Sequence, residues 1–362
     1  MRKSFSLFKI CLLSFSAVIL TAYAAQACTG ITVKAKNKDM VYARTLEWAE
    51  SLQSKVVTIP RGIKFKSTPP KNIKALNWKS KYGVTGVSVF GKPIIGDGMN
   101  EKGLHVGLFF LPEYTEYQKT KSGVPAIASW ELPTWLLTSY ATVDEAVAAL
   151  KKVQVWGAPL AGFNSTPTYH MSITDSTGGN VVVEFVKGKM NVYQNLIGVI
   201  TNSPTFDWQQ TNLSNYVNLS ATSVHPISVN NKVIAPAGQG SGMHGLPGDI
   251  TPPSRFVRAA VYTATAVKTA NGKEAAKQAA RILDAFYIVE GFSKDVQDGK
   301  TLYDHTLWMT VSDLANKVFY FTDYEGLSWM SVDLSKVDFN GDKIKSISMT
   351  GQFAKDVTGD LK

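Results

Sequence analysis

Cys28 is the residue whose position most directly suggests chemistry. It follows the triplet Ala25-Gln26-Ala27, which ends an apolar segment with a basic start. A basic start, an apolar stretch and an A-x-A triplet predict a secretory signal peptide over residues 1–27, cleaved after Ala27. Cys28 would then carry a free α-amine, with a reference pKa of roughly 7.7–8.0, beside a thiol of roughly 8.5. Because the amine is able to take the thiol proton, the pattern predicts a self-activating N-terminal nucleophile.

Two other interpretations of Cys28 stay open at this point. A free cysteine is often only a small buried apolar residue. It could instead be acylated after cleavage, as in a bacterial lipoprotein that binds apolar ligands, although Gln26 fits poorly where a small residue is required. The second cysteine, Cys11, would leave with the leader, so the exported chain would hold a single thiol and no internal disulfide. The catalytic interpretation explains the position, the uniqueness and the compartment together.

The bulk composition favours one exported globular domain over residues 28–362. Removing 27 of 362 residues leaves 335, and no linker, low-complexity tract or internal repeat divides them. The formal net charge of +10 falls to +7 when the three basic residues of the leader are removed, and the other basic residues are scattered. This pattern indicates a solvated surface rather than a nucleic-acid partner. No later segment reaches ~20 uninterrupted apolar residues, so we expect no stable membrane anchor and a periplasmic or secreted location.

The sequence offers no recognisable metal or cofactor motif. The five histidines form no HExxH or other close ligand pair, and no CxxC is present. The glycine-rich run at 238–249 lacks the GK[ST] of a phosphate-binding loop. We therefore expect neither a metal nor a cofactor.

Hydrophobic periodicity predicts a hairpin at the start of the exported chain. Residues 29–35 alternate in polarity and are rich in β-branched side chains, and a polar turn separates them from a second strand at 40–45. This hairpin would place Arg44 near Cys28. Further strands are predicted at 168–175, 181–186, 305–313, 317–323 and 327–334.

Helices are predicted between these groups of strands. One begins after the cap residue Thr142, one covers 254–268 and ends by Asn271-Gly272, and the next begins at Lys273. Antiparallel strands in groups, with helices bunched separately, indicate an α+β layered domain.

Five motifs in this order resemble the choloylglycine hydrolase family, a branch of the N-terminal nucleophile hydrolases that includes penicillin V acylases and conjugated bile acid hydrolases. The motifs are CTG at 28–30, ARTLEW at 43–48, DGMNEKGLHVGL at 97–108, GVITNSPTFDWQ at 198–209 and GLPGDITPPSRFVRAA at 245–260. The resemblance implies a four-layer αββα sandwich of two antiparallel sheets between helical layers. It also implies hydrolysis of linear, non-peptide C–N amide bonds.

The resemblance assigns roles to residues around the N-terminal cysteine. Cys28 matches the nucleophile, and Arg44 matches an arginine beside it, whose charge would favour the thiolate. Glu47 stands where many family members carry an aspartate that hydrogen-bonds the α-amine. The carboxylate is retained but is one methylene longer.

Three further residues match family positions farther along the chain. Asn100 and Asn202 match the residues that hold the developing oxyanion, a task that suits an uncharged amide donor. Arg255 matches a second arginine near the nucleophile and would orient the site. From the residues alone, each of these also reads as an ordinary turn or surface residue.

Aromatic residues predict a bulky apolar acyl pocket. Trp48 follows Glu47 directly, and the other candidates for substrate binding are Phe109, Phe110, Trp130 and Trp135. The small-molecule substrate is thus expected to be an acyl amide, such as penicillin V, an N-acyl homoserine lactone or a conjugated bile acid. An exported member resembles the Gram-negative branch, for which the first two are the more expected. Signal peptidase is the expected processing partner, and the family resemblance implies a homo-oligomer, commonly a tetramer.

Overall fold

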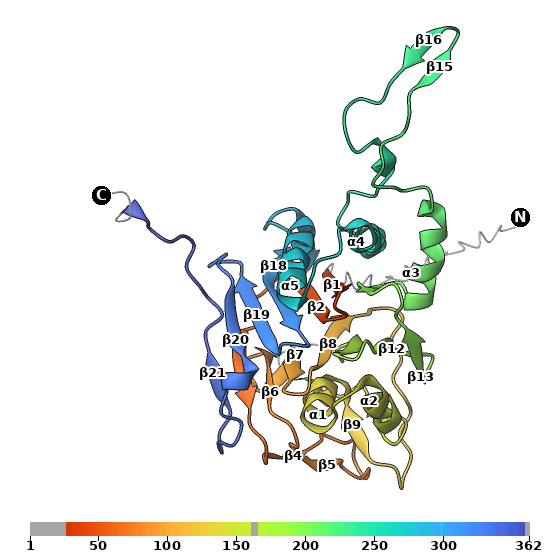
Figure 1. Ribbon diagram of the computed structural model, residues 1–362. Helices are drawn as coiled ribbons and strands as arrows, with labels where there is room; N and C mark the ends of the chain where they lie inside the picture. Colours follow the sequence, from red (N-terminus) through yellow and green to blue (C-terminus); the bar gives the residue numbers. More distant parts are fainter. Residues whose placement is uncertain (1–26, 161–165, 298, 359–362) are drawn as a thin grey trace, which may run out of the picture.

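The computed structural model of the protein describes residues 27–160, 166–297 and 299–358. The signal peptide predicted over 1–27 therefore lies outside the described residues, except for Ala27. Two large antiparallel sheets dominate the structure and lie face to face (Figure 1).

The first sheet contains the N-terminal strand and most of the C-terminal part of the chain. Its order is β14-β1-β2-β18-β19-β20, with β17 paired to β18. The strands are β1 (Cys28–Lys34), β2 (Met40–Trp48), β14 (Val199–Ile200), β17 (Ser293–Gln297), β18 (Lys300–Asp313), β19 (Val318–Asp323) and β20 (Met330–Asp333).

The second sheet is built from the middle of the chain and one late strand. Its order is β13-β12-β11-β8-β7-β6-β3-β21. The strands are β3 (Lys55–Ile59), β6 (Val84–Val89), β7 (Ile94–Asn100), β8 (Leu104–Phe110), β11 (Tyr169–Asp175), β12 (Asn180–Val186), β13 (Lys189–Gln194) and β21 (Lys345–Ile347).

Helices cover the outer face of each sheet, and this completes the expected four layers. On the second sheet lie α1 (Leu132–Ser139) and α2 (Val143–Leu150), and on the first lie α4 (Pro252–Thr265) and α5 (Gly272–Leu283), as Figure 1 shows. The predicted α+β, αββα architecture is confirmed.

The remaining elements are short. Helix α3 (Phe206–Asn212) packs beside α4. Three two-stranded ribbons are β4 (Lys64–Lys66) with β5 (Asn77–Lys79), β9 (Ala126–Ala128) with β10 (Gln154–Trp156), and β15 (Ile227–Val229) with β16 (Lys232–Ile234). The last ribbon lies at the tip of an arm that extends away from the sandwich (Figure 1).

Side-chain alternation along the inner strands decides which layer each residue enters. In β8, Leu104, Val106 and Leu108 belong to the core shared with α1 and α2, whereas Phe109 belongs to the core that contains β1 and β2. Successive strand residues point to opposite faces, so this division follows from the period of two. Gly30 in β1 supports the close approach of the sheets, because a Cβ there would overlap the Tyr42 hydroxyl and lie 2.8 Å from the Phe109 ring.

The predicted N-terminal hairpin is confirmed, with Gly30 opposite Arg44 and Cys28 opposite Leu46. The predicted cap is also confirmed, because the Thr142 side chain accepts a hydrogen bond from the Glu145 main-chain N–H at 3.3 Å. One helix boundary was wrong. Asn271 does not end the preceding helix, which stops at Thr265; its side chain instead caps the start of α5.

Candidate active site

Cys28 begins β1 and is almost fully buried, with 1% of its surface exposed. Strand β2 pairs with one edge of β1, and the short strand β14 pairs with the other edge. Asn202 follows β14 by two residues, so this pairing carries it toward Cys28. The Cys28 main-chain N–H donates to Asn202 Oδ1 at 2.7 Å.

The amide of Asn202 has an orientation that its partners determine. Its Oδ1 also accepts from Arg255 Nη2 at 2.9 Å, while its Nδ2 donates to the Phe110 carbonyl at 2.9 Å. Two donors therefore face the oxygen and a carbonyl faces the nitrogen, which fixes the assignment of O and N. Among the described residues the second Nδ2 hydrogen has no acceptor, so one amide donor is available beside Cys28.

Arg255, in the first turn of α4, joins the helix to the start of β1. Its Nη1 donates to the Cys28 carbonyl and to Thr29 Oγ1, the latter at 2.8 Å, and its Nε donates to the Ile250 carbonyl at 2.8 Å. Burial lowers the pKa of the guanidinium to about 10, an effect that the nearby Glu47 and Cys28 oppose. Arg255 therefore remains charged at neutral pH and holds both Cys28 and Asn202 in place.

Arg44 lies between the two sheets, on the same face of the first sheet as Cys28. Its Nη1 donates to the Leu108 carbonyl at 2.7 Å, and its guanidinium lies 4.1 Å from the Phe109 ring centroid and 5.2 Å from that of Trp308. Its Nη2 has no hydrogen-bond partner among the described residues. Burial raises the pKa of the Cys28 thiol, and the charge of Arg44 is the largest effect that opposes this rise.

Glu47 is buried beside the nucleophile but does not bond to its nitrogen. Its Oε1 accepts from Thr306 Oγ1 at 2.9 Å, and its Oε2 has no partner among the residues that the structure describes. The Glu47 main-chain N–H donates to the Ala27 carbonyl at 3.0 Å. Ala27 is itself only 6% exposed, so the residue before Cys28 occupies the site in the uncleaved chain.

Burial raises the pKa of the Glu47 carboxyl to about 7, although Arg255, Thr45, Thr306 and Arg44 oppose the rise. A glutamate in an unfolded chain titrates near 4.3. Between these two values the folded state holds a proton that the unfolded state lacks, so the free energy of unfolding falls as pH rises and levels off above the folded pKa.

We therefore predict that Glu47→Gln flattens the pH dependence of stability. Between pH 5 and 7 the wild type should lose up to about 1.4 kcal/mol per pH unit relative to the variant, because glutamine has no proton to lose. Urea unfolding of both proteins at pH 5, 6, 7 and 8 measures the difference. Parallel stability curves across this range would contradict a raised carboxyl pKa.

A sequence model of the linear amide C–N hydrolases of the choloylglycine hydrolase family matches residues 28–347, and the match begins at Cys28. The chain belongs to the choloylglycine hydrolase family. It is therefore a linear amide C–N hydrolase, as the motifs predicted.

Relatives in this family are similar along most of their length. The chain is 33% identical to a bile salt hydrolase/transferase from Clostridium perfringens, over 88% of this chain and 96% of the relative. It is 30% identical to a penicillin V acylase from Pectobacterium atrosepticum, over 91% and 87%. A crystal structure of a variant of the conjugated bile acid hydrolase from Clostridium perfringens superposes with a TM-score of 0.79 at 30% identity, over 91% of this chain and all of that one.

The choloylglycine hydrolase motif at 97–108 contributes a residue other than the one predicted. Asn100 donates from Nδ2 to the Leu137 and Tyr140 carbonyls, at 2.8 and 2.7 Å, and its Oδ1 accepts two main-chain N–H groups. Both amide hydrogens are thus used to hold the end of α1. Asn100 lies at the turn end of the β7–β8 hairpin. Phe110 lies at the other end of β8, about 20 Å away along the strand. The structure does not bring Asn100 to Cys28, and it is not available as an oxyanion donor.

Asp97, three residues earlier in β7, faces the opposite side of the strand and reaches the site through Arg44. Its Oδ1 lies 3.7 Å from Arg44 Nη1 and 3.1 Å from His105 Nε2, and its Oδ2 accepts from Thr310 Oγ1 at 2.8 Å. Despite burial, which acts in the other direction, His105, Arg44 and Thr310 lower the pKa of Asp97. No sequence pattern singled out Asp97, although an acid inside a family motif was a signal that could have found it.

The predicted substrate-binding aromatics fall into separate groups. Trp48 stacks on Phe110 at 4.8 Å, and Phe110 contacts Tyr169 at 4.7 Å. We call these three residues the aromatic cluster. Asn202 links this cluster to the nucleophile, because its Nδ2 donates to the Phe110 carbonyl while its Oδ1 accepts from the Cys28 N–H.

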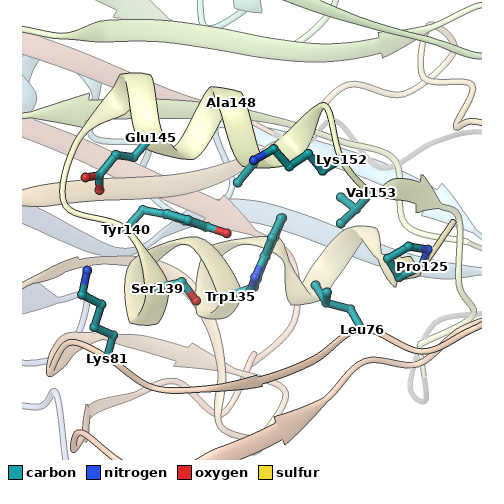
Figure 2. A pocket seen from close by; sticks show the side chains of 11 residues that line it. Leu76, Lys81, Pro125, Trp135, Ser139, Tyr140, Glu145, Ala148, Lys152 and Val153 are labelled. Carbon is teal, nitrogen blue, oxygen red and sulfur yellow. The ribbon is translucent and has the colours of Figure 1, made fainter.

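The other predicted aromatics lie at different places in the structure. Phe109 lies under Arg44 instead, and Trp130 is half-buried against both cores. Trp135 belongs to α1 and lines a hollow between α1 and α2, on the outer side of the second sheet (Figure 2). Among the described residues there is also no group of three His, Cys, Asp or Glu side chains that could hold a metal.

His170 and Glu184 form a buried clamp behind Asn202. The His170 Nε2–H donates to the Thr201 carbonyl at 3.0 Å, and its Nδ1 lies 3.0 Å from Glu184 Oε1. The same carboxylate oxygen accepts from the Phe206 main-chain N–H at 2.9 Å. The clamp therefore ties β11 and β12 to both sides of the segment that carries Asn202.

We predict that His170→Ala lowers kcat by at least about tenfold with little change in KM, because small misplacement of a catalytic group is costly. His170→Gln retains an amide donor near the position of Nε2 and should recover most of the loss. Steady-state kinetics of both variants on one amide substrate measures this. Equal loss in the two variants, or a change confined to KM, would count against a positioning role.

Proposed function

We propose that the protein becomes an active amidohydrolase when the chain is cleaved between Ala27 and Cys28. The Cys28 thiol is the nucleophile and its new α-amine is the base. One observation carries this proposal: the Cys28 nitrogen is held at 2.7 Å by Asn202 Oδ1, in a buried site that also contains Arg44 and Arg255. A hydrogen bond to Asn202 through one N–H leaves the amine lone pair free to face the thiol.

The first half of the reaction forms an acyl-thioester. The α-amine takes the thiol proton, and the thiolate, favoured by the charge of Arg44, attacks the carbonyl carbon of the substrate. The remaining Asn202 Nδ2–H donates to the oxyanion, an interaction typically worth about 10²–10³ in rate. The C–N bond then breaks, and the α-ammonium gives its proton to the leaving nitrogen.

The second half of the reaction returns the enzyme to its starting state. Water attacks the thioester carbonyl while the α-amine takes a proton from it. The C–S bond breaks, the free carboxylic acid leaves, and the thiolate recovers its proton. Arg255 holds the Cys28 carbonyl and the Asn202 amide in place throughout the cycle. No cofactor takes part in it.

The aromatic cluster and the relatives support a proposal for the substrate class. Trp48, Phe110 and Tyr169 form an aromatic cluster whose Phe110 carbonyl binds Asn202, and aromatic side chains there suit a planar or bulky apolar acyl group. We propose penicillin V, N-acyl homoserine lactones and conjugated bile acids as the candidate substrates, with the first two preferred. A panel of these amides, assayed with protein that begins at Cys28, tests the proposal. Absence of hydrolysis across the panel would overturn it.

A non-enzymatic envelope lipoprotein acylated at Cys28 is the alternative. It predicts a diacylglyceryl adduct on the cysteine, whereas the hydrolase predicts a free N-terminal thiol and amine. The intact mass of the exported protein separates the two. The buried position of Cys28 and its partners Asn202 and Arg255 support the hydrolase.

We also propose export and self-association. None of the described helices is long and apolar enough to cross a membrane, and the leader pattern supports a periplasmic or secreted enzyme processed by signal peptidase. The arm at 217–245 carries exposed apolar residues, such as Val217, Ile227 and Val233, 84%, 61% and 69% exposed. Such a surface suits contact with further copies of the chain. Sedimentation of the processed protein as a single chain would contradict this.

A further inference from the structure

A groove separate from the active site runs between α5 and the edge strand β20 of the first sheet. Its volume is about 560 Å³, which lies in the range typical of small-molecule sites. One wall is the exposed face of α5, and the other is formed by Trp329 and Met330. None of the residues that line it is a hydrogen-bond partner of Cys28, Asn202 or Arg255.

The α5 wall carries a row of positive charge. Lys273, Lys277 and Arg281 follow one another at intervals of four residues, so they lie on one side of the helix. Like charges at this spacing repel and destabilise an isolated helix. Arg281 has one exposed partner, Asp284 at 3.4 Å, while neither lysine has a carboxylate within 4 Å among the described residues. The two lysines therefore present uncompensated positive charge to the groove, whereas Arg281 is paired with Asp284, which also lines it.

Apolar side chains form much of the rest of the groove, and its other polar lining residues are Asp284, Tyr320 and Ser331. Ala276, Ala280 and Val311 line it between the walls, and the Trp329 side chain is 36% exposed on the far wall. Tryptophan and methionine provide large, adaptable apolar contact surface. A bound molecule would thus meet cations on one side and apolar surface on the other.

We propose that this groove binds one molecule of an amphipathic carboxylate. The apolar body lies against Ala280, Trp329 and Met330, and the carboxylate lies at the row formed by Lys273, Lys277 and Arg281. The binding does not depend on the proposed function. If that function holds, however, the ligand has the same chemistry as the acyl product, an apolar carboxylic acid, and the groove is then a second site for the released product.

The experiment uses dodecanoate below its micellar concentration, titrated into the processed Cys28→Ala protein in a calorimeter at low salt. The triple variant K273Q/K277Q/R281Q should bind at least about tenfold more weakly. The matched control K64Q/K66Q/K79Q removes the same charge from exposed lysines of β4 and β5 and should bind within about twofold of its parent. Ala280→Leu narrows the groove and should also weaken binding, whereas dodecyltrimethylammonium should not bind there.

Equal affinity in the two triple variants, or no dodecanoate binding at all, would overturn the proposal. Binding confined to vesicles of anionic phosphatidylglycerol would also overturn it, because it would mean a membrane surface rather than a single ligand. Amide hydrolysis by K273Q/K277Q/R281Q in the Cys28 background is measured in parallel and should be unchanged. A protein that binds dodecanoate but hydrolyses nothing would leave the groove assigned and reject only the proposed function.

Discussion

Cys28→Ala is expected to abolish amide hydrolysis, with a loss of about 10⁴-fold or more, while the fold is retained. The physical reason is that the thiol is the group that forms the acyl-enzyme bond in the proposed cycle, and the amine that remains acts there as a base. Arg44 and Arg255 have no nucleophilic lone pair, and Asn202 is an amide. Removing the nucleophile of a comparable hydrolase costs about 10⁶ in kcat. Alanine also keeps the N-terminal amine, so the variant tests the thiol alone.

The measurement is single-turnover hydrolysis of the best substrate in the panel, followed to at least 1% product. Thermal unfolding by circular dichroism serves as the folding control, because Cys28 is a small buried residue whose truncation leaves little empty space. Cys28→Ser is the graded companion. Its hydroxyl is far less acidic than a thiol, so the hydrolysis rate of Cys28→Ser should fall between those of the wild type and Cys28→Ala. Hydrolysis by Cys28→Ala within tenfold of the wild type would remove the nucleophile assignment.

The arrangement of charge around Cys28 explains why two arginines are present. Burial alone raises the thiol pKa and would leave Cys28 protonated and weakly nucleophilic. Arg44 opposes this from between the sheets, and Arg255 opposes it from α4. Asp97 in turn compensates Arg44, with His105 and Thr310 as its other partners. The site is thus a chain of paired buried charges, in which loss of one partner leaves another uncompensated.

Local patterns were sufficient to predict the parts of the site that depend on neighbouring strands. The alternation at 29–35 and 40–45 predicted the hairpin, and the hairpin brings Arg44 beside Cys28. Asn202 and Arg255 could not be placed by such patterns. They lie 174 and 227 residues from Cys28 and meet it through β14 and α4, so only the family resemblance indicated them.

Two predicted site residues, Asn100 and Trp135, lie away from Cys28. Asn100 is on the wrong face of its strand, and Trp135 is in a different layer of the fold. Asn100 and Asp97 belong to the same motif, but an interval of three residues puts them on opposite faces of β7. Trp135 was expected near the substrate, yet it belongs to α1, a helix that the sequence patterns did not predict. An aromatic residue in a buried helix packs a core whichever layer it is in, so composition alone does not identify the layer.

A protein that keeps one residue before Cys28 is expected to fold but to hydrolyse amides at least about 10²–10⁴-fold more slowly, the usual contribution of a general base. The nitrogen of Cys28 would remain a peptide amide, which has no free lone pair to take the thiol proton. The Ala27 carbonyl would also keep its hydrogen bond to the Glu47 N–H and occupy space beside the thiol.

The comparison needs two preparations of one chain. The first carries a single alanine before Cys28, and the second is the same chain after that alanine has been removed by an aminopeptidase, with intact mass as the check. Because the thiol, the arginines and Asn202 are identical in both, the difference in kcat/KM reports on the terminal amine and on the space that Ala27 vacates. Alkylation of the thiol by iodoacetamide separates these two contributions. If the retained alanine leaves the thiol accessible but removes its base, alkylation is slow at pH 7 and becomes faster as pH rises toward the thiol pKa. If the alanine blocks access to the thiol, alkylation stays slow across this pH range. Equal kcat/KM before and after removal would mean that another group takes the thiol proton, and His170 and Glu47 would then be the buried bases to test.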